Sequence, residues 1–206
     1  MDTGANQPRK NLIEWNLSFS MVAAPEDEAR LVKLAMAGDF DSYAALYTCH
    51  LDAIYRYIFY RNGDSEDAQD LTEQVFLKAW EALPNYRPVG CNFINWLYRI
   101  ANNIVVDYHR RLKLIHFEGL REDALWTIQS HETTLDIVIL KEEAAALAAG
   151  IARLPEDYQQ VIILRFIEGL GHAEIAQILD KSEVACRGIQ HRALASLNKI
   201  LTDHAK

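Results

Sequence analysis

The stretch that decides the fold of the C-terminal part is EIAQILDKS, residues 174–182. Ile175 and Ala176 recur at helical spacing with Leu179 and face inward, and the small alanine lets a second helix approach closely. A turn follows Leu179, and Ser182 is a good N-cap for the next helix. The stretch therefore predicts a helix-turn-helix. This motif indicates DNA binding without saying which kind of regulator carries it.

The second helix of this motif, from Ser182 to about Leu201, has an apolar side and a basic side. Its expected buried side consists of Cys186, Ile189, Ala193, Leu197 and Ile200. The side chains offered to DNA are Lys181, Ser182, Arg187, Gly188, His191 and Arg192. A glycine inside a helix costs about 1 kcal/mol relative to alanine. Gly188 therefore either lets DNA approach the backbone or is a tolerated defect.

The net charge of −8 conceals two local basic stretches. Residues 99–113 carry four cations and one acid, and residues 181–199 carry four cations and one acid. Two basic stretches in an acidic chain suggest two separate nucleic-acid contacts. The acidic remainder suits a basic protein surface.

Helical periodicity runs through nearly the whole chain and no strand pattern occurs, which predicts an all-α fold. The expected helices cover about 26–37, 39–61, 65–83, 92–112, 135–154, 155–168, 172–179 and 182–201. Residues 84–92 contain two prolines and a glycine and are expected to form a loop. We therefore expect a mobile extension over 1–25, a four-helix domain over 26–112, a linker over 113–134, and a four-helix domain over 135–206 that contains the helix-turn-helix.

The third expected helix has two faces. The apolar stripe is Ala68, Leu71, Val75, Ala79 and Leu83, and the other face is Asp70, Glu73, Gln74, Leu77, Lys78 and Glu81. Such a polar face is usually only solvated. Here it could also be an acidic docking surface for a basic partner helix.

The fourth expected helix buries Phe93, Trp96, Leu97, Ile100, Ala101, Ile104, Val105 and Tyr108. Its other stripe carries Arg99, Asn103, Asp107, Arg110 and Arg111. Asparagine can read base edges and arginine can grip phosphate. Unpaired bases also need stacking groups, which Tyr86, Arg87 and Asn92 in the preceding loop could supply.

Several other classes of function find no support in the sequence. The three cysteines, Cys49, Cys91 and Cys186, are far apart and odd in number, so buried or half-buried thiols in a reducing cytoplasm are expected rather than disulfides. The histidines His50, His109 and His191 lack the paired spacing of a zinc site. No catalytic triad or phosphate loop occurs, so we expect no enzyme activity, cofactor or metal. Glu14 interrupts a weakly apolar N-terminal stretch that is a poor secretory signal, and Met21 could equally be the natural start.

Three blocks of sequence resemble one known family. DAQDLTEQVFLKAW, residues 67–80, resembles conserved region 2.2 of extracytoplasmic-function (ECF) sigma factors of the sigma-70 family. WLYRIANN, residues 96–103, with the charged residues after it, is similar to regions 2.3 and 2.4. The segments at 154–156, 164–166, 174–176 and 191–194 resemble region 4. The resemblance covers about residues 26–201, with the blocks in the family's order.

The resemblance implies a function and a set of partners. Core RNA polymerase would be bound through the coiled coil of its beta-prime subunit by Asp70, Glu73, Gln74 and Lys78. The minus-ten promoter element, with a flipped base, would be held by Tyr86, Arg87, Asn92, Arg99, Asn103, Arg110 and Arg111. The helix-turn-helix would read the minus-thirty-five element, and the linker would thread toward the polymerase active-site channel. Such factors are usually held by an anti-sigma factor, which the sequence does not identify.

Some positions depart from the family pattern. The usual turn glycine is Asp180, and the recognition helix carries Ala185, Cys186, Gly188 and Ile189 where other residue types are common. These departures affect which sequence is read at minus-thirty-five and leave the expected fold unchanged. The competing hypothesis is a helix-turn-helix regulator whose N-terminal domain binds a ligand or dimerises. The arginine and asparagine stripe beside an aromatic loop favours the sigma factor.

Overall fold

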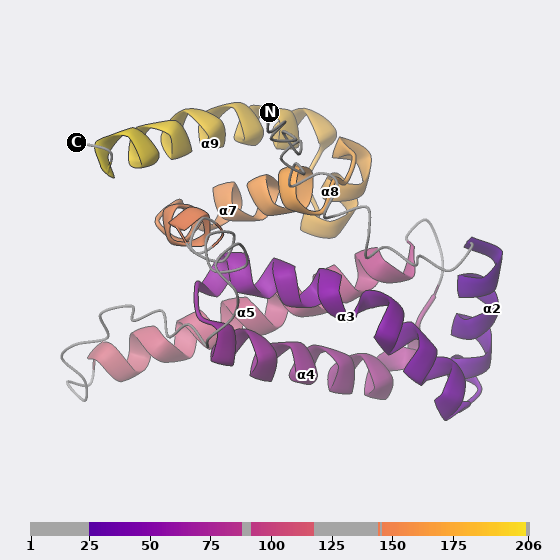
Figure 1. Ribbon diagram of the computed structural model, residues 1–206. Coiled ribbons are helices and arrows are strands. Elements are labelled where there is room, and N and C mark those ends of the chain that lie inside the picture. The colour runs from indigo at the N-terminus through magenta and orange to yellow at the C-terminus, as the bar shows by residue number, and fades with distance from the viewer. Residues whose placement is uncertain (1–24, 88–91, 118–143, 145, 205–206) are drawn as a thin grey trace, which may run out of the picture. The chain divides into compact units, whose positions relative to one another are not determined.

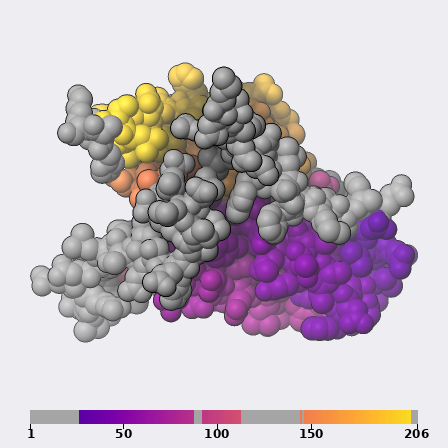
Figure 2. All heavy atoms as spheres, in the orientation of Figure 1, coloured from indigo at the N-terminus to yellow at the C-terminus, as the bar shows by residue number. Residues whose placement is uncertain are grey.

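The computed structural model describes residues 25–87, 92–117, 144 and 146–204 (Figure 1). Figure 2 shows the heavy atoms as spheres in the same orientation, coloured along the chain. The chain forms two compact bodies, Met1–Cys49 and His50–Lys206. Every regular element in the described ranges is a helix, which confirms the all-α prediction. Most of the expected N-terminal extension and linker lies outside the described residues, so these domain limits stay predictions.

The first body contains α2, Pro25–Met36, and the beginning of α3, Phe40–Asn62. Gly38 separates the two helices with φ +95°, a backbone conformation that side chains disfavour. The Asp39 carboxylate caps α3 by accepting from the backbone N–H of Ser42 at 3.0 Å. Hydrogen bonds from Ser42 also hold the pKa of Asp39 below its usual value.

The second body begins with the remainder of α3, followed by α4, Ser65–Ala82, and α5, Phe93–Phe117. The Asp64 carboxylate caps α4 by accepting two backbone N–H groups at 2.8 and 2.9 Å. A 3-10 turn, η1, covers Leu83–Asn85. Helix α4 packs on α5. All five residues of the predicted apolar stripe of α4 are buried, which confirms that prediction: Ala68, Leu71, Val75, Ala79 and Leu83.

The C-terminal part of this body contains helical residues 146–152, α7 (Glu156–Ile162), α8 (His172–Leu179) and α9 (Glu183–His204). Both α7 and α8 pack on α9. The expected single helix over 155–168 is wrong in its second half. The α-helix ends at Ile162, and a π-helix, η2, covers Ile163–Ile167. Its wider turn is closed by the Glu168 N–H donating to the Ile163 carbonyl at 3.0 Å.

The predicted helix-turn-helix is present. Asp180 ends α8 in the left-handed conformation, with φ 53° and ψ 46°, and its backbone N–H donates to the Ala176 carbonyl. The Ser182 hydroxyl accepts from the Ala185 N–H at 3.1 Å, which confirms the predicted cap of α9. Cys186 is buried on the inner side of α9, as expected. Cys49 on α3 is exposed, so the expectation that its thiol is buried or half-buried is wrong.

A cluster of polar side chains joins α3 and α5 to the C-terminal helices within the second body. We call it the polar seam. Its members are Arg56, Arg61, Tyr98, Asn102, Glu156, Gln160 and Glu168. Helix α5 also contacts α8.

Candidate protein and nucleic-acid interfaces

The outer face of α4 is exposed along its whole length. Its members are Asp70, Glu73, Gln74, Leu77, Lys78 and Glu81. Leu77 is 60% exposed and lies in a shallow hollow lined also by Asp70, Glu73 and Gln74. An apolar side chain beside two carboxylates suits a basic partner that also offers an apolar group. The expected exposure is confirmed, and the docking role remains a prediction.

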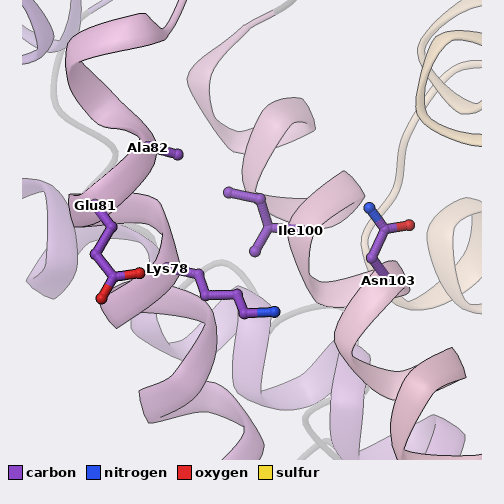
Figure 3. A pocket seen from close by; sticks show the side chains of 5 residues that line it. All are labelled: Lys78, Glu81, Ala82, Ile100 and Asn103. Carbon is purple, nitrogen blue, oxygen red and sulfur yellow. The ribbon is translucent and has the colours of Figure 1, made fainter.

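A second hollow, of about 370 Å³, lies between α4 and α5 (Figure 3). Lys78, Glu81 and Ala82 line it from α4, and Ile100 and Asn103 line it from α5. In Figure 3 the amine of Lys78 extends from α4 toward α5. The sequence placed Lys78 in the docking set and Asn103 in the DNA set. In the structure both residues line one hollow, where the Lys78 amine and the Asn103 amide lie beside the apolar side chains of Ala82 and Ile100.

The polar stripe of α5 is open to solvent. Arg99, Asn103, Arg110 and Arg111 are all exposed. The guanidinium of Arg110 donates to the Asp107 carboxylate at 2.8 Å, and the Arg111 Nε donates to the Asp107 carbonyl at 3.4 Å. Exposed ion pairs of this kind contribute about 1 kcal/mol or less. They leave these arginines available to a phosphate.

The loop before α5 departs from one expectation. Tyr86 is only 5% exposed, and its ring centre lies 4.8 Å from that of Trp96 and 5.7 Å from that of Phe93. The expected exposure of Tyr86 is therefore wrong, because its ring packs in an aromatic cluster against α5. Stacking of Tyr86 on a base stays a prediction. Arg87 and Asn92 are exposed, and residues 88–91 lie outside the described part.

The first turns of α9 present a mixed basic and apolar surface. Arg187, His191 and Arg192 are exposed, and Arg187 pairs with Glu183 at 3.3 Å. Val184, which the sequence pattern did not predict as a DNA contact, is 78% exposed. An exposed apolar group beside arginine can contact a thymine methyl group. The one sequence signal for Val184 as a DNA contact is its position in the first turn of α9, just after the Ser182 cap.

Two other residues that are expected to contact DNA from this surface already make contacts within the protein. The Lys181 amine lies 3.3 Å from the Asp157 carboxylate, and Ser182 caps α9. Gly188 is different, because a Cβ there would meet only the end of the Arg192 side chain, at 3.6 Å. Internal packing therefore does not require glycine at this position, and close approach of DNA and a tolerated defect both stay open as explanations.

Two features are absent from the part of the chain that the structure describes. No helix in it is long and apolar enough to cross a bilayer. No group of three or more histidine, cysteine or acidic side chains in it could hold a metal ion.

Comparison with known proteins decides the family. Residues 46–115 match the family model for Sigma-70 region 2, and residues 144–197 match that for Sigma-70 region 4. The chain is 36% identical over 189 residues to the ECF RNA polymerase sigma factor BldN of Streptomyces coelicolor, a match that spans 89% of this chain and 70% of BldN. The chain belongs to the ECF family of RNA polymerase sigma factors. A ligand-binding or dimerising N-terminal domain is therefore discarded as an alternative.

Solved structures agree with the fold of this sigma factor. The structure of CnrH in complex with the cytosolic domain of CnrY has a TM-score of 0.67 at 24% identity and covers 86% of this chain and 98% of CnrH. The sigma factor RpoE in complex with the anti-sigma factor NepR, from Bartonella quintana, has a TM-score of 0.61 at 18% identity and covers 78% of this chain and 96% of RpoE. In this sigma factor, region 2 contains α4 and α5, and region 4 contains α7, α8 and α9.

Proposed function

We propose that this sigma factor binds core RNA polymerase through α4, reads the minus-thirty-five element with α9 and captures unpaired minus-ten bases beside α5. It would act in the cytoplasm with the polymerase, by binding alone and without catalysing a reaction. The observation that supports this most strongly is the placement of three chemically distinct exposed surfaces on separate helices. These are the acidic face of α4, the arginine and asparagine stripe of α5, and the basic start of α9.

Docking would use the acidic face of α4. Carboxylates at positions 70 and 73 flank Leu77, so a basic helix could meet charge at the rim and an apolar contact at the centre. This arrangement fits the beta-prime coiled coil that the family resemblance implies as the partner.

Reading of the minus-thirty-five element would use the start of α9. Arg187 and Arg192 could contact guanine edges or phosphates, Val184 a thymine methyl group, and Gly188 would let the helix approach closely. The helix N-terminus, with Ser182 as its cap, adds backbone N–H groups that favour a phosphate.

Strand capture at minus-ten would use Asn92 and Asn103 with the arginines of α5. Unstacking a base costs a few kcal/mol, which hydrogen bonds and stacking on the captured base can offset. Trapping of transiently unpaired bases needs no ATP. The hollow beside Asn103 is a suitable place for such a base, because Ile100 and Ala82 offer apolar surface and Lys78 offers a cation.

A protein regulator is part of the proposal. One similar solved structure holds CnrH with the cytosolic domain of CnrY, and the other holds the sigma factor RpoE with the anti-sigma factor NepR. We propose that an anti-sigma factor likewise binds this chain. Its identity would be sought first in the neighbouring reading frame.

The test of strand capture separates duplex binding from melting. Asn92→Ala and Asn103→Ala should leave core binding and minus-thirty-five contact in place but reduce open complex, measured by permanganate reactivity of unpaired thymines near minus-ten. Asn198→Ala, an exposed asparagine near the end of α9, is the matched control and should melt DNA normally. Normal permanganate reactivity in a variant that carries both Asn92→Ala and Asn103→Ala would show that other residues capture the strand.

A further inference from the structure

The four residues that the sequence assigns to polymerase docking lie in two separate hollows along α4. Asp70, Glu73 and Gln74 line the hollow around Leu77. Lys78 lines the other hollow, between α4 and α5, and no described residue lines both. The structure therefore separates Lys78 from the three residues with which the sequence groups it.

The position of Lys78 on α4 explains this separation. Consecutive residues of an α-helix lie about 100° apart around its axis, so Lys78 projects about 100° away from Leu77. The rotation carries Lys78 off the acidic face and toward the buried stripe that contains Val75 and Ala79. Helix α4 packs on α5, and in Figure 3 the Lys78 amine extends toward α5, where Asn103 lies.

The charge of Lys78 is not paired within the described part of the protein. Helix α4 carries five carboxylates and this one lysine. A lysine in such a helix usually pairs with a carboxylate three or four residues away. Glu81 lies three residues on, yet the Lys78 amine forms no ion pair with it or with any other residue that the structure describes. The exposed amine is therefore available to an anion from outside the chain.

Helix α5 supplies the groups that surround this amine. Ile100 and Asn103 line the hollow opposite Lys78. Arg99 is exposed four residues before Asn103 and so shares its face of the helix. The hollow thus combines an apolar wall, an amide and an amine, with a second cation one turn away. A nucleotide offers the matching groups, because its base has apolar faces and polar edges and its phosphate is negative.

We propose that Lys78 binds a backbone phosphate of the unpaired minus-ten strand and takes no part in docking to the polymerase. The base next to this phosphate is the one that Asn103 holds beside Ile100. This inference rests on the proposed function, because it assigns a role within the strand-capture site. Helix α4 then has two partners, the polymerase at its acidic face and the DNA strand at Lys78.

The sign of the charge also favours DNA over the polymerase as the partner of Lys78. A basic helix that meets Asp70 and Glu73 would be repelled by an amine on the same surface. A phosphate attracts that amine, and each such contact releases counterions from the DNA. A lysine turned away from the acidic face therefore serves both partners, since it leaves the docking surface uniformly acidic.

The first test measures how salt affects DNA binding by the holoenzyme. The probe is a fork-junction promoter with a duplex minus-thirty-five element and a single-stranded minus-ten element. Lys78→Met should lower the slope of log affinity against log salt by about 0.7, the value for one single-strand phosphate, and weaken binding about fivefold at about 0.1 M salt. Lys78→Arg keeps the charge and should bind nearly as the wild type does. Lys33→Met, at an exposed lysine of α2, is the matched control and should change neither quantity.

A second test locates the phosphate. Neutral methylphosphonates replace the phosphates of the minus-ten strand one at a time. One replacement should weaken binding of the wild-type holoenzyme about fivefold and have little further effect on the Lys78→Met holoenzyme. Additive losses at every position would overturn the phosphate contact. Glu81→Gln removes a carboxylate from the same hollow and should strengthen binding about twofold, so weaker binding in this variant would also overturn it.

Affinity for core polymerase separates this inference from the proposed function. Lys78→Met should bind core polymerase as tightly as the wild type, whereas Asp70→Lys with Glu73→Lys should bind it more weakly. Loss of core binding in Lys78→Met would overturn the inference and return Lys78 to the docking surface. A wild-type holoenzyme that does not bind the fork-junction promoter would contradict the proposed function instead.

Discussion

Asp180 occupies a backbone conformation that the family usually gives to glycine. Its φ of 53° is the only positive φ at a non-glycine residue in the described part of the chain. Aspartate tolerates this conformation better than most residues, because its short polar side chain can bond locally. The turn of the helix-turn-helix is therefore formed without glycine, at some cost in stability.

Substitutions at Asp180 should show that cost. Asp180→Gly should raise the free energy of unfolding by up to about 1 kcal/mol, and Asp180→Val should lower it by at least about 1 kcal/mol, because a β-branched residue is strained at positive φ. Thermal unfolding followed by circular dichroism measures both, with Asp180→Asn as a near-neutral control. Equal stability of the glycine and valine variants would mean that the turn adopts another conformation in solution.

The arginines of α9 should differ in what they contribute. Arg187→Ala and Arg192→Ala should each weaken binding to a minus-thirty-five site, by about 1–3 kcal/mol with relaxed specificity where a base contact is lost. Loss of a phosphate contact would weaken binding to all DNA sequences alike. Footprinting and binding titrations over several salt concentrations separate the two cases. Arg153→Ala, an exposed arginine before α7, is the control, and an unchanged footprint in both α9 variants would remove the assignment.

At the scale of whole helices, α4 shows how much the sequence could predict. The apolar and polar residues of α4 alternate with a period of 3.6 residues, so both the buried stripe and the exposed polar face could be predicted from the sequence. The burial of Thr72 and Phe76 was not, because these residues lie at the edges of the stripe. The π-helix was also missed, since its apolar residues Ile163–Ile167 suit an α-helix equally well. The charged site residues of α4, α5 and α9 are exposed as predicted, whereas Tyr86 in the loop is buried.

Charge reversal on α4 should affect docking without affecting folding. Asp70→Lys with Glu73→Lys should weaken binding to core polymerase while helical content is retained, because both carboxylates are exposed. Asp70→Asn with Glu73→Gln removes the charges without reversing them and should have a smaller effect. Affinity from fluorescence titration gives the comparison. Wild-type affinity in the reversed variant would show that another face binds the polymerase.

At the scale of the whole molecule, the polar seam could not have been predicted from the sequence. Arg56 and Glu168 are 112 positions apart, and nothing in local periodicity connects them. Arg61, at the end of α3, reads as an ordinary surface cation next to a turn, yet it is 1% exposed. Such pairs depend on how two domains meet, which is a tertiary property.

Buried tyrosines should make the fold sensitive to alkali. Burial is the main cause that raises the pKa of five described tyrosines: Tyr55, Tyr57, Tyr60, Tyr98 and Tyr108. A pKa that is higher in the folded than in the unfolded state gives stability that is present below about pH 10 and is lost as the pH rises further. Phenolate absorbance should therefore rise fully only as helical signal disappears, whereas the chain in guanidinium should titrate near pH 10. Complete ionisation with intact helices would contradict this burial.

The π-helix gives the seam an unusual sensitivity to chain length. Its i to i+5 turn accommodates one residue more than an α-helix would, directly before Glu168. Deleting one residue within Ile163–Ile167 could restore a regular α-helix, and each residue of an α-helix rotates the chain by about 100°. The carboxylate would then point away from Arg56 while α8 and α9 keep their own contacts. A single-codon deletion is thus a short evolutionary path between a sigma factor with the Arg56–Glu168 ion pair and one without it. Alignments of relatives should show length variation at this point that is coupled to the residue at position 56.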